Sequence, residues 1–580
     1  MQFIINNFLT NQPRSYVDEV KNRWLNSMRP VTVFAAVLGS LYLVGCEKGS
    51  QSEQVVSQEN ASVESVVEKS SASMESVESD LIAKTQYGPV RGFEDDGVKV
   101  FKGVRYGADT ATTRFQAPKA PKPWSEVKDA LEYGNSTRQV PTGSGGGLFA
   151  SWKPEPVPAL SEDSLFLNVW TPALRDGKKR PVMVWFHGGG FTSGSGSSQA
   201  YDGVRLANRG DVVVVTVNHR LNYFGYLNLA HYGEKFIDSG AAGILDLVAS
   251  LKWVRDNIAE FGGDPNNVLI FGESGGGMKV STLLAMDKAK GLFHKAVVQS
   301  GPAITLAKSE DSQKAAALVV EKLGLTEDTI NDILSMSPEK IETAARAVAK
   351  ENRIAVGSSP TVDGRNIPRH PFLEGAPPQS ADVPVLIGTT RTEMSLLAGS
   401  RDPKLFDITW GTLPQELSKL DSSIDSVEAI KIYKEENSSI GAVELYFTAA
   451  TDRGFLNRSV ELAEKKSQQA GAPTYFYLLN WDTPVDNGKW FSPHALEIGM
   501  VFDNVEKSAS MSGTSDEAQR IADLMSEAWL AFAKTGNPNH KDLPNWPEYN
   551  AENHPVMVFD VDPAVVNDPH GKQRRVFLSQ

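Results

Sequence analysis

From Ile82 onward, short apolar stretches rich in β-branched residues alternate with segments of helical periodicity. The clearest short stretches are residues 182–186, 212–217, 268–271, 296–298, 383–387 and 475–479. Between two of them, residues 245–258 place Leu247, Leu251, Val254 and Ile258 at helical spacing. Strands that are apolar at every position are buried on both faces, and helices between them connect the strands of a parallel sheet. We therefore predict an α/β fold with a mostly parallel central β-sheet flanked by helices.

The start of this region carries the pattern of a β-hairpin. Residues 89–93 and 98–101 flank the turn sequence Asp95-Asp96-Gly97. No internal repeat and no strong interdomain linker is evident after residue 82. We therefore expect residues 81–580 to form a single domain.

The N-terminal segment has the composition of an export signal. Residues 31–45 are apolar, but a helix that spans a bilayer needs about 20 such residues. Lys21, Arg23 and Arg29 precede this stretch, and Cys46, the single cysteine of the chain, follows it. The sequence Leu-Val-Gly-Cys resembles the bacterial lipobox, which implies cleavage before Cys46 and lipidation of its thiol. The alternatives are an uncleaved membrane anchor and a cysteine buried in an apolar segment.

We accordingly interpret residues 1–45 as a lipoprotein signal peptide, and residues 46–80 as the lipidated cysteine and a flexible tether. The tether is rich in Ser, Glu and Val and has no aromatic residue, although a short amphipathic helix is an alternative. Met28 would begin a signal of more usual length, so residues 1–27 are a candidate over-extension of the gene start. The lipid would hold an exported protein at a membrane. The protein would then be periplasmic or at the cell surface, and the sequence leaves open which face of the membrane it occupies. Glu47 after the cysteine is not the aspartate associated with inner-membrane retention, which favours the outer membrane in a source that has one.

Composition excludes several classes of function. The net charge of −13 and the lack of a long Lys/Arg run argue against nucleic acid as a partner. The sequence has no Cys/His cluster of the zinc type and no GxxxxGK[ST] phosphate loop. We therefore expect neither a metal nor an organic cofactor.

Ser274 has the sequence context of a catalytic nucleophile. The strand 268–271 leads into Gly-Glu-Ser-Gly-Gly-Gly at 272–277, and a helical stretch follows. A strand, a serine between glycines and a helix together form the nucleophile elbow, in which a sharp turn exposes the serine hydroxyl. A glycine-rich turn with an incidental serine, such as a phosphate site, is the alternative.

A second glycine motif lies upstream. The strand 182–186 leads into His187-Gly188-Gly189-Gly190, and consecutive glycines let backbone N–H groups converge on one point. We predict an oxyanion hole formed by the N–H groups of Gly189, Gly190 and Gly275. On this interpretation His187 is structural. A merely flexible glycine loop is the alternative.

Chain order narrows the choice of acid and base. A serine of this type is followed by its acid and then by its histidine. Of the nine histidines, His494, His540, His554 and His570 follow every plausible acid, and only His494 comes shortly after a predicted strand. Glu393 lies in the loop after the strand 383–387, whereas Asp382 lies at the opposite end of that strand. Asp363 competes from a predicted turn, and a solvated carboxylate is the alternative for Glu393.

The chain resembles the type-B carboxylesterases, the α/β-hydrolase family that includes the cholinesterases, over about residues 82–559. The stretches that carry this resemblance are residues 101–104, 114–118, 161–170, 218–221, 243–246, 253–265, 529–539 and 546–547. The resemblance implies large helical insertions in the fold and places the triad acid at Glu393. His494 with Glu497 matches the family's HxxE pattern.

Two departures from the family pattern are notable. Ser164 stands where the family usually has a cysteine, so the corresponding disulfide is missing. Gly275 stands where alanine usually follows the nucleophile, which keeps the backbone N–H. Neither departure removes a catalytic atom.

The expected activity is hydrolysis of small-to-medium carboxylic esters by a Ser274–His494–Glu393 triad through an acyl-enzyme. A lipase, thioesterase or amidase would use the same residues. A non-catalytic, cholinesterase-like binding protein is a further alternative, although such proteins lack the serine. Residues 143–158 are expected to border the entrance, with Trp152 either as a wall of the pocket or as surface packing. The sequence leaves the oligomeric state open.

Overall fold

The computed structural model describes residues 80–139 and 147–578. The interpretations of residues 1–45, of Cys46 and of nearly all of the tether lie outside the described residues, as do residues 143–146 of the expected entrance. None of the described helices is long and apolar enough to cross a membrane.

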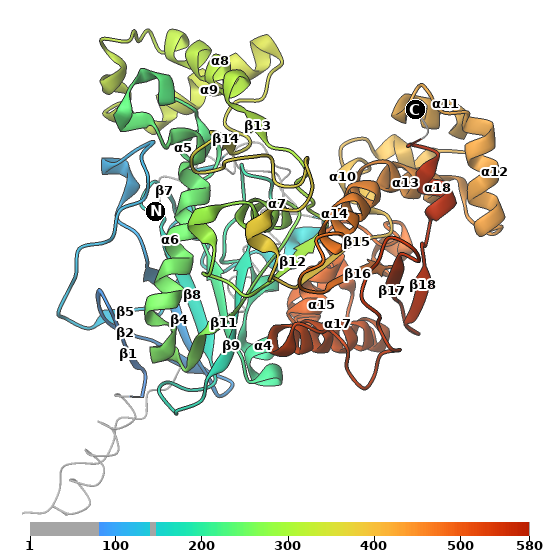
Figure 1. Ribbon diagram of the computed structural model, residues 1–580, viewed down its shortest axis with the longest axis horizontal. Coiled ribbons are helices and arrows are strands. Elements are labelled where there is room, and N and C mark those ends of the chain that lie inside the picture. Colours follow the sequence, from blue (N-terminus) through green and yellow to red (C-terminus); the bar gives the residue numbers. More distant parts are fainter. Residues whose placement is uncertain (1–79, 140–146, 579–580) are drawn as a thin grey trace, which may run out of the picture. The chain divides into compact units, whose positions relative to one another are not determined.

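The central feature of the described residues is an eleven-stranded sheet in the order β18-β17-β16-β15-β12-β11-β9-β10-β8-β4-β3 (Figure 1). Neighbouring strands from β10 to β17 are all parallel, and antiparallel strands complete both edges. The strands are β3 (Phe93–Asp95), β4 (Val98–Arg105), β8 (Phe166–Thr171), β9 (Arg180–Phe186), β10 (Val213–Val217), β11 (Gly263–Glu273), β12 (Lys295–Gln299), β15 (Val385–Thr390), β16 (Thr474–Leu479), β17 (Pro555–Phe559) and β18 (Ala564–Asn567). The predicted mostly parallel sheet is confirmed.

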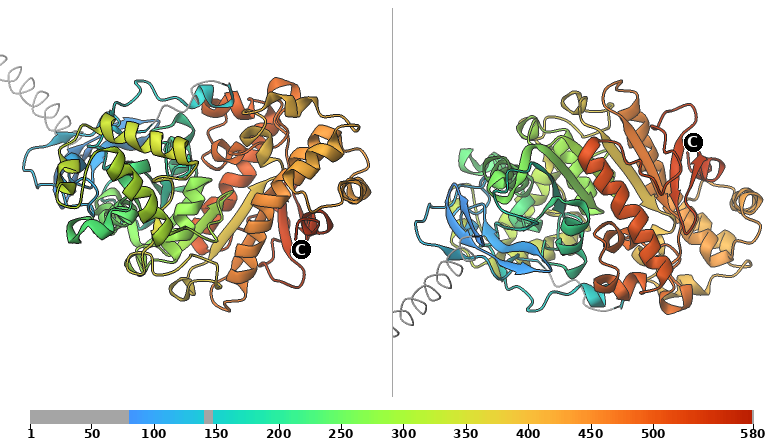
Figure 2. Two further views of the ribbon diagram at one scale, coloured as in Figure 1. Left: turned by 90° about the horizontal axis from the view of Figure 1, so that it is seen from above. Right: turned by 90° about the horizontal axis from the view of Figure 1, so that it is seen from below.

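Helices cover both faces of this sheet because its central strands are apolar on both faces. Valines and leucines of alternating strand positions pack into two separate cores. One core contains α6 (Ala242–Asn257), α7 (Gly275–Leu284) and α14 (Asn457–Ser467). The other contains α4 (Val204–Gly210), α15 (Leu496–Val501) and α17 (Asp516–Thr535), and Figure 2 shows α17 lying across the strands.

The remaining helices form two groups with smaller cores of their own. In the upper left of Figure 1, α8 (Ser309–Lys322) packs on α9 (Pro338–Asn352). In the upper right, a second group contains α11 (Leu413–Leu420), α12 (Ser426–Glu436) and α13 (Ala442–Thr451). These groups are the helical insertions that the family resemblance implies. The described residues also contain the short α-helices α5 (Asn222–Tyr226), α10 (Glu393–Leu397), α16 (Ala509–Ser512) and α18 (Gly571–Arg575).

The predicted N-terminal hairpin is correct at its turn but wrong at its first strand. β3 and β4 pair across Asp96-Gly97. The earlier strand, β2 (Gly88–Arg91), pairs instead with β1 (Ile82–Thr85) in a separate small sheet with β5 (Lys128–Asp129). Gly92 lies between the two strands and packs closely on β4, since a Cβ atom there would lie 2.3 Å from the carbonyl oxygen of Val100. The two other small sheets pair β6 (Ser136–Thr137) with β7 (Leu160–Ser161) and β13 (Ala307–Lys308) with β14 (Thr361–Val362).

Candidate active site

Ser274 occupies a strained turn between β11 and α7. Its φ and ψ angles are 57° and −121°, a conformation that is unfavourable for a residue with a side chain. The turn closes tightly, since a Cβ atom at Gly276 would lie 2.0 Å from the carbonyl oxygen of Phe186 and one at Gly272 would lie 2.6 Å from the same atom. The N–H of Ser274 donates to the carbonyl oxygen of Gln299 at 2.8 Å, which ties the turn to β12. This is the geometry that the sequence predicts for a nucleophile elbow.

The loop after β9 brings a second set of glycines to the elbow. Gly189 and Gly190 have φ angles of 81° and 62°, which only glycine adopts without strain. Gly188 and Gly189 line the same cavity as Ser274. Within the described residues, the N–H groups of Gly189, Gly190 and Gly275 donate to no protein acceptor. They are therefore available to an oxygen atom of a bound molecule.

Glu393 and His494 come together from segments that follow the neighbouring strands β15 and β16. Glu393 is the first residue of α10 rather than a loop residue, and its Oε1 accepts the N–H of Thr390 at 2.9 Å. Its Oε2 accepts a hydrogen bond from Nδ1 of His494. The two loops are joined because the Thr392 hydroxyl donates to Ser492 O at 2.8 Å and the Thr392 N–H donates to the same oxygen at 3.1 Å.

Glu273 faces the other edge of the histidine ring. Its Oε1 lies 3.1 Å from Nε2 of His494, and both side chains are buried. No hydrogen bond joins Nε2 to the Ser274 hydroxyl among the described residues, although Ser274, His494 and Glu273 line one cavity. Oε1 of Glu273 has no hydrogen-bond partner within the described residues, so its contact with Nε2 is an ion pair only when His494 is protonated.

Burial and charge act in opposite directions on this pair. Burial alone would lower the pKa of His494, but the carboxylates of Glu273 and Glu393 outweigh it and raise this pKa to about 9. Burial also raises the pKa of Glu273 well above its ordinary value, while the charged histidine opposes this. The carboxylates thus favour the charged form of His494, and the histidine acts as a base only after it has lost that proton. Glu273 stands inside the serine motif, but its pairing with a distant histidine has no signal in the sequence.

A further carboxylate lies behind the histidine. Glu497 Oε1 accepts from the Ser300 hydroxyl at 3.4 Å and from the Tyr477 hydroxyl at 3.3 Å. Burial raises the pKa of Glu497 to about 7, and the nearby Glu393 acts in the same direction. The HxxE spacing thus brings a third buried acid, after Glu393 and Glu273, to the site.

The other histidines lie outside this arrangement. His187 and His219 are buried with their rings 4.7 Å apart, and burial, reinforced by the charge of Lys279, lowers their pKa values well below the usual range. His554 faces Glu464 at 3.1 Å, and His570 faces Asp452 at 3.1 Å.

The competing acids also lie elsewhere. Asp363 closes a turn, where its Oδ1 accepts the N–H groups of Arg365, Asn366 and Ile367. Asp382 precedes β15, at the end of that strand opposite to Glu393.

A cavity of about 650 Å³ opens onto Ser274. Trp152 is 6% exposed and forms part of the wall of this cavity. It is therefore a wall of the pocket and not a residue packed on the surface. The ring of Phe149 packs edge-on against Trp152 at 4.9 Å, and both belong to the 3-10 helix η2 (Gly147–Trp152). The apolar and aromatic lining residues are Phe149, Trp152, Pro154, Val157, Pro158, Leu160, Tyr201, Leu397, Ala495 and Ile498. The cavity suits an uncharged, apolar group next to the serine.

One group of side chains in the described residues has the spacing of a cation site. Glu273, Glu393 and His494 each offer a ligand atom within 4.8 Å of the others. The hydrogen bond from His494 to Glu393 and the ion-pair distance from His494 to Glu273 account for these contacts. We therefore assign the group to proton transfer.

Comparison with known proteins matches residues 79–577 to the carboxylesterase family. The para-nitrobenzyl esterase of Bacillus subtilis is 36% identical over 502 residues, which cover 85% of this chain and 98% of the relative. The phenmedipham hydrolase of Pseudarthrobacter oxydans is 30% identical over 495 residues, which cover 84% of this chain and 96% of the relative.

Solved structures agree with this relationship. A carboxylesterase of Geobacillus stearothermophilus has a TM-score of 0.73 and 36% identity, with 86% of this chain and 100% of that chain covered. An esterase of Clostridium hathewayi described as hydrolysing aliphatic aromatic polyesters has a TM-score of 0.73 and 32% identity. The match covers 86% of this chain and 97% of that chain. The fold is that of the α/β-hydrolases. From its sequence and its fold together, the chain belongs to the carboxylesterase family and is a serine hydrolase of carboxylic esters.

Proposed function

We propose that the chain hydrolyses small-to-medium carboxylic esters through an acyl-enzyme on Ser274. One observation carries this proposal: the Glu393–His494 hydrogen bond lies beside a strained serine, in the same cavity as glycine N–H groups that have no protein acceptor. This observation supports a base, a nucleophile and oxyanion donors acting at one site, as acyl transfer requires.

In the proposed reaction, His494 Nε2 accepts the proton of the Ser274 hydroxyl while the serine oxygen attacks the ester carbonyl. Nε2 must first exchange its contact with Glu273 for one with Ser274. The N–H groups of Gly189, Gly190 and Gly275 stabilise the negative oxygen, and His494 returns the proton to the departing alcohol. Water then attacks the acyl-enzyme by the same route. Glu393 orients His494 and stabilises its charged form.

The cavity supports uncharged esters with an apolar or aromatic portion. Phe149, Trp152 and Tyr201 supply aromatic surface near the serine. The names of two relatives point the same way, since one acts on a para-nitrobenzyl ester and the other on phenmedipham. A panel of para-nitrophenyl esters of different chain lengths, a thioester and an anilide tests this class. Preference for the anilide, the thioester or the longest chain would replace it with an amidase, a thioesterase or a lipase.

The central experiment compares the protein with its Ser274→Ala variant on para-nitrophenyl butyrate. We expect kcat to fall by several orders of magnitude, since loss of a triad serine in a protease costs about 10⁶. A serine-directed phosphonate should add one adduct to the wild type, at Ser274, and none to the variant. Wild-type protein that neither turns over nor takes up the phosphonate would favour the binding-protein alternative.

For the N-terminal segment we propose export and lipid anchoring through Cys46. The support is the sequence alone: an apolar stretch after positive residues, followed by the single cysteine. In a bacterial host, labelled palmitate should enter the wild type but not a Cys46→Ser variant, and the variant should leave the membrane fraction. Equal labelling of both proteins would refute lipidation at Cys46. N-terminal mapping of the unprocessed precursor tests whether residues 1–27 are translated.

A further inference from the structure

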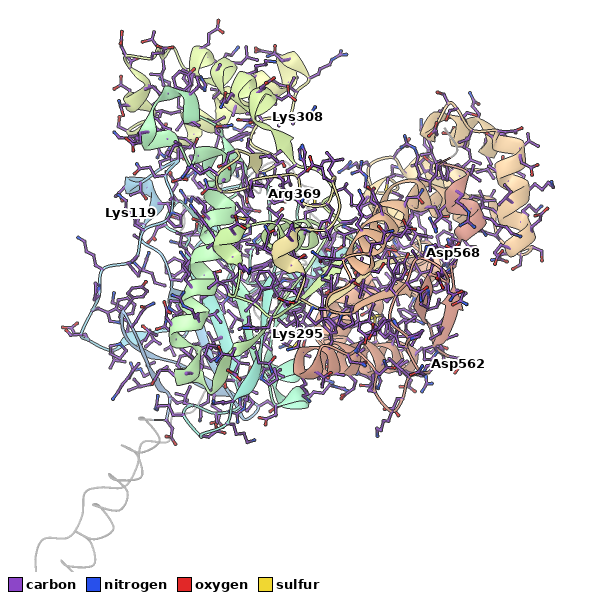
Figure 3. All side chains as sticks on the ribbon, viewed as in Figure 1. Lys119, Lys295, Lys308, Arg369, Asp562 and Asp568 are labelled. Atoms are coloured by element: carbon purple, nitrogen blue, oxygen red, sulfur yellow. The ribbon has the colours of Figure 1, made fainter. Side chains whose placement is uncertain are left out.

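Lys279 is a buried lysine behind the candidate oxyanion hole. It lies in α7, four residues after Gly275, with 0% of its surface exposed, whereas Lys119 and Lys308 lie on the surface (Figure 3). Burial strips an ammonium group of its water, so such a residue is rare without compensating contacts. Its Nζ donates to the carbonyl oxygen of His187 at 2.8 Å and to that of Gly190 at 2.9 Å. The proposed reaction gives Lys279 no role in proton transfer.

These two carbonyl groups lie on either side of the candidate oxyanion donors. The N–H groups of Gly189 and Gly190 belong to the two peptide groups between them. Each of those peptide groups is also held by its carbonyl: Gly188 O contacts His187 Nδ1 at 2.9 Å, and Gly189 O accepts the N–H of Ser193 at 3.1 Å. In a trans peptide the C=O and N–H point in opposite directions, so a fixed carbonyl fixes the direction of the N–H.

We propose that Lys279 is a positioning residue of the oxyanion hole, which holds residues 187–190 in the shape that presents the N–H groups of Gly189 and Gly190. The inference rests on the proposed function, because the loop has this role only if an ester carbonyl reacts at Ser274. Burial lowers the pKa of Lys279 to about 7, and the charge of Glu273 opposes this shift. In its protonated form the lysine also places a positive charge behind the same peptide groups, where such a charge is little screened.

Gly275 completes the arrangement. A Cβ atom at this position would lie 2.1 Å from the carbonyl oxygen of Gly190 and 2.5 Å from its nitrogen. That carbonyl oxygen is the one that Lys279 binds. The lysine therefore holds Gly190 against α7 in the space left by the missing side chain at 275. This gives a physical reason for glycine where the family usually has alanine.

Lys279→Met tests the lysine, because methionine fills similar space without charge or hydrogen-bond donors. Lys466→Met is the matched control. Lys466 is 1% exposed, and its Nζ donates to Ser380 O at 2.8 Å, Gln469 Oε1 at 2.8 Å and Ala381 O at 3.4 Å, all outside the cavity at Ser274. The measurements are kcat and KM on para-nitrophenyl butyrate, inhibition by a trifluoromethyl ketone, and Tm of the full chain.

We expect Lys279→Met to lower kcat by about 10- to 100-fold with little change in KM, and to weaken the ketone, which forms a tetrahedral oxyanion on the serine, by a similar factor. Lys466→Met should leave kcat and the inhibition by the ketone near the wild-type values, whatever the effect of this substitution on Tm. A kcat for Lys279→Met within about twofold of wild type would overturn the inference, and so would equal losses in both variants.

Gly275→Ala gives a second test that keeps the lysine. In the presence of Lys279 the added methyl group should displace Gly190 and lower kcat. In the Lys279→Met background the same substitution should cost much less, because the loop is no longer held against α7. An unchanged kcat for Gly275→Ala, or equal losses in the two backgrounds, would overturn the coupling. An inactive wild type would instead refute the proposed function, and the inference with it.

Discussion

Oε1 of Glu273 lies 3.1 Å from Nε2 of His494, the ring atom that has to accept the serine proton. The residue before the nucleophile thus occupies the position that the nucleophile needs. The carboxylates of Glu273 and Glu393 raise the pKa of His494 to about 9, against the effect of burial. A histidine that acts as a base must be neutral, so kcat/KM should rise with pH through this pKa.

Glu273→Gln should move this rise to lower pH. The carboxylate favours the charged imidazole, so its removal lowers the pKa of His494 toward its ordinary value. The pH dependence of kcat/KM on an ester with a pH-independent chromophore measures the shift. The conservative change Glu273→Asp, which keeps the charge, should shift the profile less. A profile for Glu273→Gln that coincides with the wild type would contradict this account of the pair.

Glu393→Gln should reduce kcat by about 10³- to 10⁴-fold, because an amide in place of the acid allows the wrong histidine tautomer. Glu497→Gln is the control. Glu497 is equally buried, but it contacts Ser300 and Tyr477 instead of the histidine ring. Steady-state kinetics with a Tm for each variant separates the two roles. Comparable losses for both variants would argue against Glu393 as the sole orienting acid.

Trp152→Ala should widen the cavity next to the serine and shift preference toward longer acyl chains. The ratio of kcat/KM for para-nitrophenyl octanoate to that for the acetate is expected to rise by about 10-fold, in keeping with the 1–3 kcal/mol that small changes in an apolar pocket are worth. Trp410, which is 45% exposed, provides the control substitution Trp410→Ala. An unchanged ratio for Trp152→Ala would place the acyl chain elsewhere in the cavity.

Asp246→Ala should destabilise the domain by about 3–5 kcal/mol, since it leaves a buried charge without its partner. Arg220 donates from Nε and Nη2 to this carboxylate at 2.8 and 2.7 Å, and the two side chains are 2% and 0% exposed. The Lys322–Glu351 pair lies at the surface, so Glu351→Ala should cost less than about 1 kcal/mol. Urea unfolding of the three proteins measures both values. A small loss for Asp246→Ala would show that Arg220 finds another partner.

Much of the fold could be predicted from local patterns. All six apolar stretches form strands of the main sheet, because strands buried on both faces must be apolar throughout. The boundaries moved by a few residues: β11 extends over Gly263–Glu273, and α6 begins at Ala242. The first hairpin strand was assigned to the wrong partner, because the close approach of Gly92 to Val100 joins residues from different strands and leaves no local pattern.

From the sequence alone, the residue types of the candidate site could be predicted, because they lie in local turns or follow one another in a fixed order along the chain. The serine turn, the glycine loop and the order of acid and histidine are local or sequential features, so Ser274 and His494 could be proposed before any contact was known. For Glu393 these features left a solvated carboxylate as the alternative, and the family resemblance placed the acid there. Only the tertiary structure decided how distant buried charges face one another. Glu273 meets His494, and Lys279 meets the carbonyl groups of His187 and Gly190, across separate elements of the fold. A group's charge depends on such neighbours and on its loss of water, and both are fixed only when the chain packs.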